Sequence, residues 1–184
     1  MNRILNISRS RKLAGFSLIE VLVAIVIFSI GLLGIASLQI AGLRFASGSQ
    51  HRAVATMQAQ NIADRMLANL GGVENEYYNI TGSMPGSYTT DCSTADCNPT
   101  DLATYDLVTW NLENADLLPS GDGIVCLDWS PNDGDSSNWA CDNSGDVYAI
   151  KIEWQERIAG DEDIEDAAGE GVQTRQLVMT FVPL

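Results

Sequence analysis

The stretch Gly15-Phe16-Ser17-Leu18-Ile19-Glu20, with the apolar run that follows it, decides how this chain is organised. From Val21 to Leu43 the sequence has 23 residues without a charged side chain. A helix of that length spans about 34 Å, which is enough to cross a hydrocarbon core of about 30 Å. The sequence therefore predicts a transmembrane helix close to the N-terminus.

The charges around this run predict its orientation. Residues 1–15 contain four basic side chains and no acidic one. This excess predicts that they stay in the cytoplasm while the rest of the chain is exported. Glu20 is the exception, because a carboxylate costs about 2.5–3.5 kcal/mol near the centre of a membrane helix, and somewhat less near an end. We expect such a residue only where it has a partner.

The basic leader that ends at Gly15, with Phe16 after it and Glu20 at the fifth place of the remaining chain, resembles the class III signal of type IV pilins and pseudopilins. The resemblance implies that a prepilin peptidase cuts after Gly15 and methylates the new N-terminal residue, Phe16. It also implies that Glu20 meets the amine of a neighbouring subunit. A secretory signal peptide or an uncleaved anchor is the alternative. It fits less well because a signal peptide has an apolar core of only about 7–15 residues.

The residues from Glu20 to Gln39, with the segments 101–110 and 118–121, most resemble the minor pilins of the PilV family. This implies a structural subunit in pilus assembly, not an enzyme. The implied partners are the prepilin peptidase, other minor pilins, the major pilin, an inner-membrane assembly platform and a tip adhesin. The implied location is the inner membrane, with a periplasmic head, and then the pilus at the cell surface. A minor pseudopilin of type II secretion and a membrane-anchored ligand-binding domain remain alternatives.

An α+β pilin fold is expected from this resemblance and from the order of elements. Residues 1–15 form the cleaved leader, 16–45 the membrane or fibre-core half of a long helix, and 46–184 the extracytoplasmic head. The absence of proline between residues 16 and 70 predicts one helix, ended by Gly71-Gly72. Its second half carries an apolar stripe that should pack on a sheet, formed by Ala55, Ala59, Ile62, Met66 and Leu70.

The rest of the head is expected to hold a long irregular connection, a short helix and three strands. The connection is residues 73–99, and the helix is 100–115, capped by Thr100. One face of that helix is expected to carry Leu102, Tyr105, Val108 and Leu112, with Trp110 at its flank. Strands are expected at residues 123–129, 147–155 and 174–182, joined as an antiparallel meander. In the second strand, apolar side chains alternate with a set expected to face water, namely Val147, Ala149, Lys151 and Glu153.

Four cysteines follow the apolar run, at Cys92, Cys97, Cys126 and Cys141. Export to an oxidising compartment would allow two disulfides, for which three connectivities exist. The short loops that they close favour the pairs Cys92–Cys97 and Cys126–Cys141. A zinc site is the alternative, but the spacing is poor and no histidine lies nearby.

After Gly15 the chain has 24 acidic and 6 basic side chains. Such a surface repels phosphate, which argues against nucleic-acid binding. The sequence lacks a phosphate-binding loop and the common hydrolase motifs, and its lone histidine, His51, is expected to be solvated. We expect no cofactor and no metal. Calcium is the alternative for a loop of oxygen donors, but the loop lacks the EF-hand pattern. These donors are Asn132, Asp133, Asp135, Asn138, Asp142 and Asp146.

Overall fold

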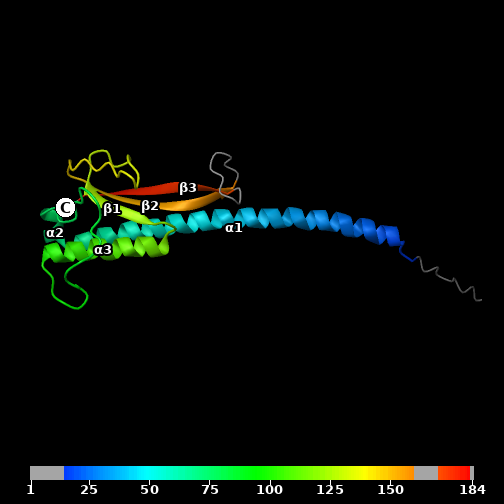
Figure 1. The fold of residues 1–184 in the computed structure, drawn as a ribbon, viewed down its shortest axis with the longest axis horizontal. Coiled ribbons are helices and arrows are strands. Elements are labelled where there is room, and N and C mark those ends of the chain that lie inside the picture. The colour runs from blue at the N-terminus through cyan, green and yellow to red at the C-terminus, as the bar shows by residue number, and fades with distance from the viewer. Residues whose placement is uncertain (1–14, 160–169, 183–184) are drawn as a thin grey trace, which may run out of the picture. The chain divides into compact units, whose positions relative to one another are not determined.

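The computed structural model of the chain describes residues 15–159 and 170–182. Its elements, in chain order, are α1 (Leu18–Ala68), α2 (Leu70–Glu74), α3 (Pro99–Leu117), β1 (Asp122–Leu127), β2 (Tyr148–Ala159) and β3 (Glu170–Phe181) (Figure 1). A long helix followed by a three-stranded antiparallel sheet confirms the predicted α+β, pilin-like architecture. The chain divides into two compact units between Leu43 and Arg44.

The first unit is the apolar part of α1. All side chains from Leu18 to Leu43 are exposed, and none of the most apolar 18-residue window, with a mean hydropathy of 2.8, is buried. By length and composition this helix can cross a membrane, although a signal sequence near an N-terminus meets the same criterion. The leader predicted at residues 1–15 lies outside the described residues, apart from Gly15.

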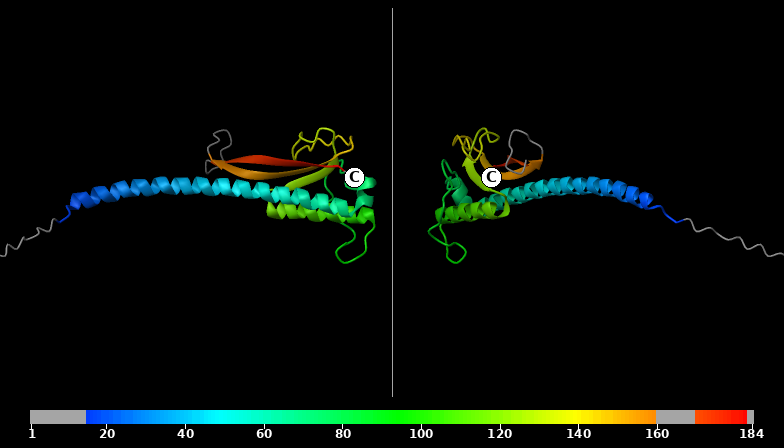
Figure 2. Two further views of the ribbon diagram at one scale, coloured as in Figure 1. Left: turned by 180° about the vertical axis from the view of Figure 1, so that it is seen from behind. Right: turned by 45° about the vertical axis from the view of Figure 1, so that its right-hand side comes forward.

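In the second unit, the sheet has the strand order β1-β2-β3, and both neighbouring pairs are antiparallel. Ile150 of β2 lies between Val125 of β1 and Met179 of β3. The predicted meander is therefore confirmed, while β2 and β3 extend further toward their connection than the alternating pattern indicated. Figure 2 shows α3 beside the end of α1 that the sheet covers, so that helices and sheet form two layers.

The core of this unit lies between these two layers. The predicted stripe Ala55, Ala59, Ile62 and Met66 is completely buried. It belongs to one apolar cluster with the inner face of β2, which comprises Tyr148, Ile150, Ile152 and Trp154. The helical period of 3.6 and the strand period of 2 identified both surfaces correctly.

The predicted end of the long helix at Gly71-Gly72 was wrong. The helix α1 ends at Ala68, and Asn69 caps the short helix α2 by accepting a hydrogen bond from the Gly72 amide at 3.1 Å. A Cβ on Gly72 would collide with the Asn69 side chain, so a glycine at this position leaves room for the side chain that caps α2. Leu70, predicted as part of the buried stripe, is 48% exposed because the helix has already ended.

The predicted cap of the second helix was also wrong, and its predicted buried face was only partly right. Asn98 caps α3 by accepting from the Asp101 amide at 2.9 Å, and Pro99 fills the first helical position. Val108 is buried as predicted, whereas the predicted Leu112 is 62% exposed. The buried face also includes Asp106, Leu107, Trp110 and Asn114. Two residues of this buried face, Asp106 and Asn114, are polar, so the spacing of apolar residues alone does not identify the face. Trp110 lies fully in the core, where its indole N–H donates to the Gln58 carbonyl oxygen at 2.8 Å.

Candidate functional site

Gly15 and Phe16 precede the first residue of α1. Residues 15–17 are not helical, and the Phe16 side chain is 84% exposed. Apart from its chain neighbours, no described residue has an atom within 4 Å of the place that a Cβ on Gly15 would occupy. The peptide bond between them therefore lies in exposed, irregular backbone, the kind of segment that proteases cut most readily.

Glu20 lies in the first turn of α1, where its negative charge is favourable at the positive end of the helix dipole. Its side chain is exposed, and it forms no ion pair with any residue that the structure describes. Glu20 lies in an open depression of about 560 Å³. The other residues that line it are apolar, namely Phe16, Val21, Ala24, Ile25 and Phe28. A carboxylate in such a surface can bind a cationic group from another chain.

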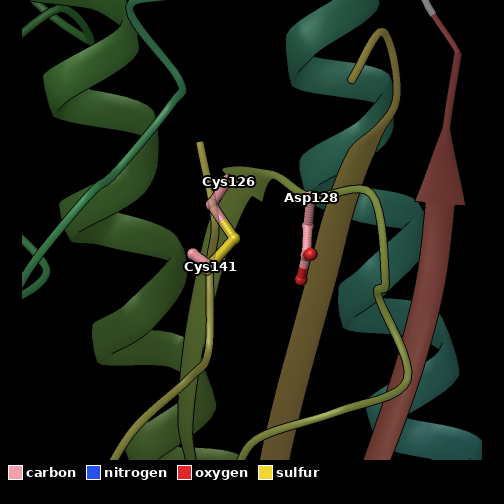
Figure 3. Close-up of side chains that lie close together, drawn as sticks. All are labelled: Cys126, Asp128 and Cys141. Atoms are coloured by element: carbon pink, nitrogen blue, oxygen red, sulfur yellow. A yellow bond between two sulfur atoms is a disulfide. The ribbon is translucent and has the colours of Figure 1, made fainter. Parts of the chain in front are cut away.

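The head contains two disulfides, Cys92–Cys97 and Cys126–Cys141, which is the pairing that the loop lengths favoured. The second bond joins the buried Cys126 of β1 to a residue of the loop 128–147. Asp128 lies close to this disulfide (Figure 3), and the three side chains together resemble a metal-binding set. Because both sulfur atoms are in the disulfide, they cannot act as thiolate ligands.

Lys151 is completely buried, which contradicts its predicted place on a solvent-facing side of β2. Its ammonium group pairs with the carboxylates of Asp128 at 2.6 Å and Asp133 at 3.3 Å. It also donates to the carbonyl oxygens of Asp133 at 3.0 Å and Trp139 at 2.7 Å. The ammonium group thus holds four oxygen atoms of the loop 128–147 against the outer face of the sheet.

The same face holds the loop at a second place. Glu153, also predicted to face water, is only 6% exposed. Its carboxylate accepts from the amide of Ser136 at 2.6 Å and from the hydroxyl of the same residue at 2.8 Å. Ile124, Cys126 and Ala149 form a small apolar cluster beneath the loop. The central strand is therefore buried on both faces, because a long loop covers the face that alternation assigned to solvent.

Three of the loop carboxylates considered for calcium, those of Asp133, Asp135 and Asp142, have protein partners. The hydroxyls of Ser130, Ser137 and Ser144 lower the pKa values of Asp133, Asp135 and Asp142, respectively. The Asp135 carboxylate also accepts from the amides of Ser137 and Asn138. These contacts close tight turns within the loop. These three carboxylates therefore stabilise the turns of the loop.

A buried polar network joins α1 to α3. The Tyr78 hydroxyl donates to Asp106 at 2.6 Å and accepts from the Asn69 amide group at 3.2 Å. The Arg65 guanidinium lies 3.7 Å from the Asp106 carboxylate and 3.0 Å from that of Glu113. Burial raises the pKa of Asp106, and burial together with the Asp106 hydrogen bond raises that of Tyr78. Because each group has a partner inside the fold, this network positions the two helices.

Two further features bear on ligand binding. His51 is half-buried rather than solvated, and its Nδ1 atom has no hydrogen-bond partner among the described residues. A cavity of about 390 Å³ lies between the loop 128–147 and the segment 80–84. It has both apolar and polar lining groups, including Ile124, Trp139, Asp122 and Asn138.

Sequence reasoning missed the buried set around Lys151. One signal was present, because Cys126 and Cys141 were expected to pair and this bond draws the loop toward the sheet. Ile124 and Cys126 also place apolar side chains on the outer face of β1, where a solvated sheet would carry polar residues.

A family model described as the prokaryotic N-terminal methylation motif matches residues 10–36. The match includes Gly15, Phe16 and Glu20. No curated protein and no solved structure gave a match to the chain. The matched motif, followed by a long apolar helix and an antiparallel sheet, supports placement of the chain among type IV pilin-like proteins and is consistent with membrane anchoring.

Proposed function

We propose that the chain is a minor type IV pilin of the PilV kind, a structural subunit that primes or modifies pilus assembly. The observation that carries the proposal is the methylation motif at residues 10–36, with one exposed carboxylate, Glu20, on an apolar helix. Membrane anchoring keeps the subunit available before assembly, and the head faces the periplasm. The partners in this proposal are other minor pilins, the major pilin, the assembly platform and a tip adhesin.

In the proposed mechanism, a prepilin peptidase cuts between Gly15 and Phe16 and methylates the freed amine. The apolar part of α1 then leaves the membrane and joins a bundle of similar helices. Glu20 accepts the cationic amine of a neighbouring subunit, which removes the cost of a lone carboxylate in an apolar medium. The open depression around Glu20 gives that amine a route to the carboxylate.

The mature N-terminus tests this proposal directly. We expect the intact mass of the exported protein to correspond to residues 16–184 with one methyl group and two disulfides. Fragmentation should place the methyl group on the amine of Phe16. A mature form that starts elsewhere, or one that keeps residues 1–15, would contradict the proposal.

The same motif would serve a minor pseudopilin of type II secretion, so deletion of the gene distinguishes the two roles. Loss of pili or of twitching, with secretion intact, is expected for the minor pilin. Loss of secretion with normal pili would assign the chain to the secretion system instead.

A further inference from the structure

Along the edge of β1 that faces away from β2, main-chain groups form hydrogen bonds with residues outside the sheet. The Val125 carbonyl oxygen accepts from the Ile80 amide at 2.9 Å, and the Leu127 amide donates to the Asn79 side chain at 2.9 Å. The Leu127 carbonyl oxygen accepts from the Asn143 amide at 3.1 Å. One edge of the sheet is thus covered by the chain itself.

These bonds also determine which groups of β3 point away from the sheet. Outward and inward main-chain groups alternate along a strand. The main-chain groups of Val125 point away from β2. Those of its partner Ile150 therefore point toward β3, where Ile150 pairs with Met179. Met179 therefore bonds to β2, and its neighbours Val178 and Thr180 direct their N–H and C=O groups away from the sheet.

The outward set of β3 comprises Val172, Thr174, Gln176, Val178 and Thr180. Among the described residues, no main-chain group outside β2 bonds to the main chain of β3. Its 12 residues pair with β2 in unbroken register, without a bulge. The strand therefore offers a long and regular row of hydrogen-bonding groups.

This edge lacks the features by which proteins normally prevent strand pairing, such as proline, lysine or a bulge. Between residues 171 and 182 there is no proline, and Arg175 is the only charged residue. The side chains of Leu177, Met179 and Phe181 are partly exposed, although their neighbours on β2 are fully buried. An additional strand would cover the apolar surface that remains.

Charge indicates what kind of strand fits. The chain has 24 acidic residues, yet residues 171–182 contain none. Pairing of two copies through this edge would bring two strongly acidic heads together, and their repulsion opposes it. A neutral segment of a different protein meets no such repulsion, and a basic segment is in addition attracted by the surrounding negative charge.

We propose that the free edge of β3 is a strand-addition site, which binds an extended, neutral or basic segment from a different protein of the cell envelope. Main-chain hydrogen bonds to Gln176, Val178 and Thr180 supply the affinity, and alternate apolar side chains of the added strand pack beside Leu177 and Met179. This site is separate from Glu20 and does not depend on cleavage at Gly15.

Photocrosslinking of the full-length chain in its native envelope tests the proposal. A photoreactive benzoyl-phenylalanine replaces Thr174, which is exposed and belongs to the outward set. We expect a crosslink to a different protein, at a residue within an extended segment that has alternating apolar residues and no acidic ones. A crosslink to a second copy of this chain, to a helix, or to no protein at all would overturn the proposal.

Two substitutions at Thr180 provide a matched comparison. Thr180→Pro removes an N–H that points away from β2, so it spares the bonds between β2 and β3. Thr180→Val keeps that N–H. We expect the crosslink yield to fall about tenfold in Thr180→Pro, through the lost hydrogen bond and the clash of the ring, and to change less than about twofold in Thr180→Val.

A loss of folding in Thr180→Pro is detected by a lower melting temperature of the protein. In that event Thr180→Lys tests the same edge, because an edge lysine opposes strand addition without removing a main-chain group. The melting temperature should be unchanged in this variant and the crosslink yield reduced. Equal crosslinking in the wild type and in every correctly folded variant would overturn the proposal. Cleavage at Gly15 should be normal in all of them.

Discussion

The ammonium group of Lys151 lies 2.6 Å from the carboxylate of Asp128, and neither side chain has any exposed surface. Moving two charges out of water costs several kcal/mol for each ion, and their attraction offsets this only when further hydrogen bonds complete the set. Here the ammonium group also donates hydrogen bonds to the carbonyl oxygens of Asp133 and Trp139. The pair therefore fixes the loop 128–147 on the sheet together with these two carbonyl contacts.

Replacement of Lys151 by methionine should destabilise the head strongly. The substitution keeps most of the apolar stem but leaves the Asp128 carboxylate buried without its counter-ion. We expect a loss of about 3–5 kcal/mol in the free energy of unfolding. Urea unfolding of the full-length chain in detergent micelles measures it.

The double variant Lys151→Met, Asp128→Asn is the matched control. An asparagine can still accept the hydrogen bond that Asp128 receives from the Ser130 amide, and it carries no charge. We expect the double variant to recover a large part of the lost stability. Equal stability of the single and double variants would show that the buried charge is not the cause.

The two disulfides should contribute unequally to stability. Cys92 and Cys97 are separated by 5 positions, and Cys126 and Cys141 by 15. Loop-closure entropy gives about 2 kcal/mol for the first and about 3 kcal/mol for the second. We therefore expect the pair of substitutions Cys126→Ala, Cys141→Ala to lower the melting temperature more than Cys92→Ala, Cys97→Ala. The reverse order would contradict the role of the second bond in holding the loop.

The layered fold was predictable because its two periodic signals are strong. Ala55, Ala59, Ile62 and Met66 repeat at helical spacing, and the inner face of β2 repeats at every second residue. Each pattern is local in the sequence, and each identifies the side of the element that is buried. The methylation motif was readable for the same reason, since Gly15, Phe16 and Glu20 lie within six positions.

The outer face of the sheet was not predictable by the same rule. Lys151 and Glu153 occupy polar positions in an alternating strand, which normally indicates solvent. Their partners, Asp128, Asp133 and Ser136, belong to a loop whose path depends on tertiary contacts. The face of α3 was misplaced for a related reason, because Asp106 is buried through its hydrogen bond to Tyr78.

Asp106 should make stability depend on pH in an unusual direction. Burial raises its pKa above the ordinary value of 3.8, so the folded chain binds this proton more tightly than the unfolded chain. The contribution of Asp106 to stability is therefore full below 3.8 and is lost as the pH rises through the raised pKa. We expect Asp106→Asn to remove this decline in a series of unfolding measurements between about pH 3 and pH 7.

Asp133→Asn serves as the comparison, because the pKa of Asp133 is lowered, first by the Ser130 hydroxyl. Its contribution is present above 3.8 and is lost as the pH falls through the lowered pKa. The two variants should therefore change the pH profile with opposite slopes. Profiles of the same slope would mean that burial does not raise the pKa of Asp106.

Glu20 provides the test of assembly through charge. Glu20→Gln preserves the size of the side chain and its hydrogen-bonding oxygen but removes the charge that would bind a neighbouring amine. Since Gly15 and Phe16 precede α1, cleavage and methylation should be unchanged, and insertion into the membrane should be as good or better. Incorporation into pili, measured by immunoblot of sheared fibres, should fall about tenfold or more, as expected for a desolvated amine left without its counter-ion. Glu20→Asp retains the charge on a shorter stem and should restore part of the incorporation. If Glu20→Gln entered fibres at the wild-type level, Glu20 would not be an assembly contact, and its place in an apolar helix would need a partner within the membrane instead.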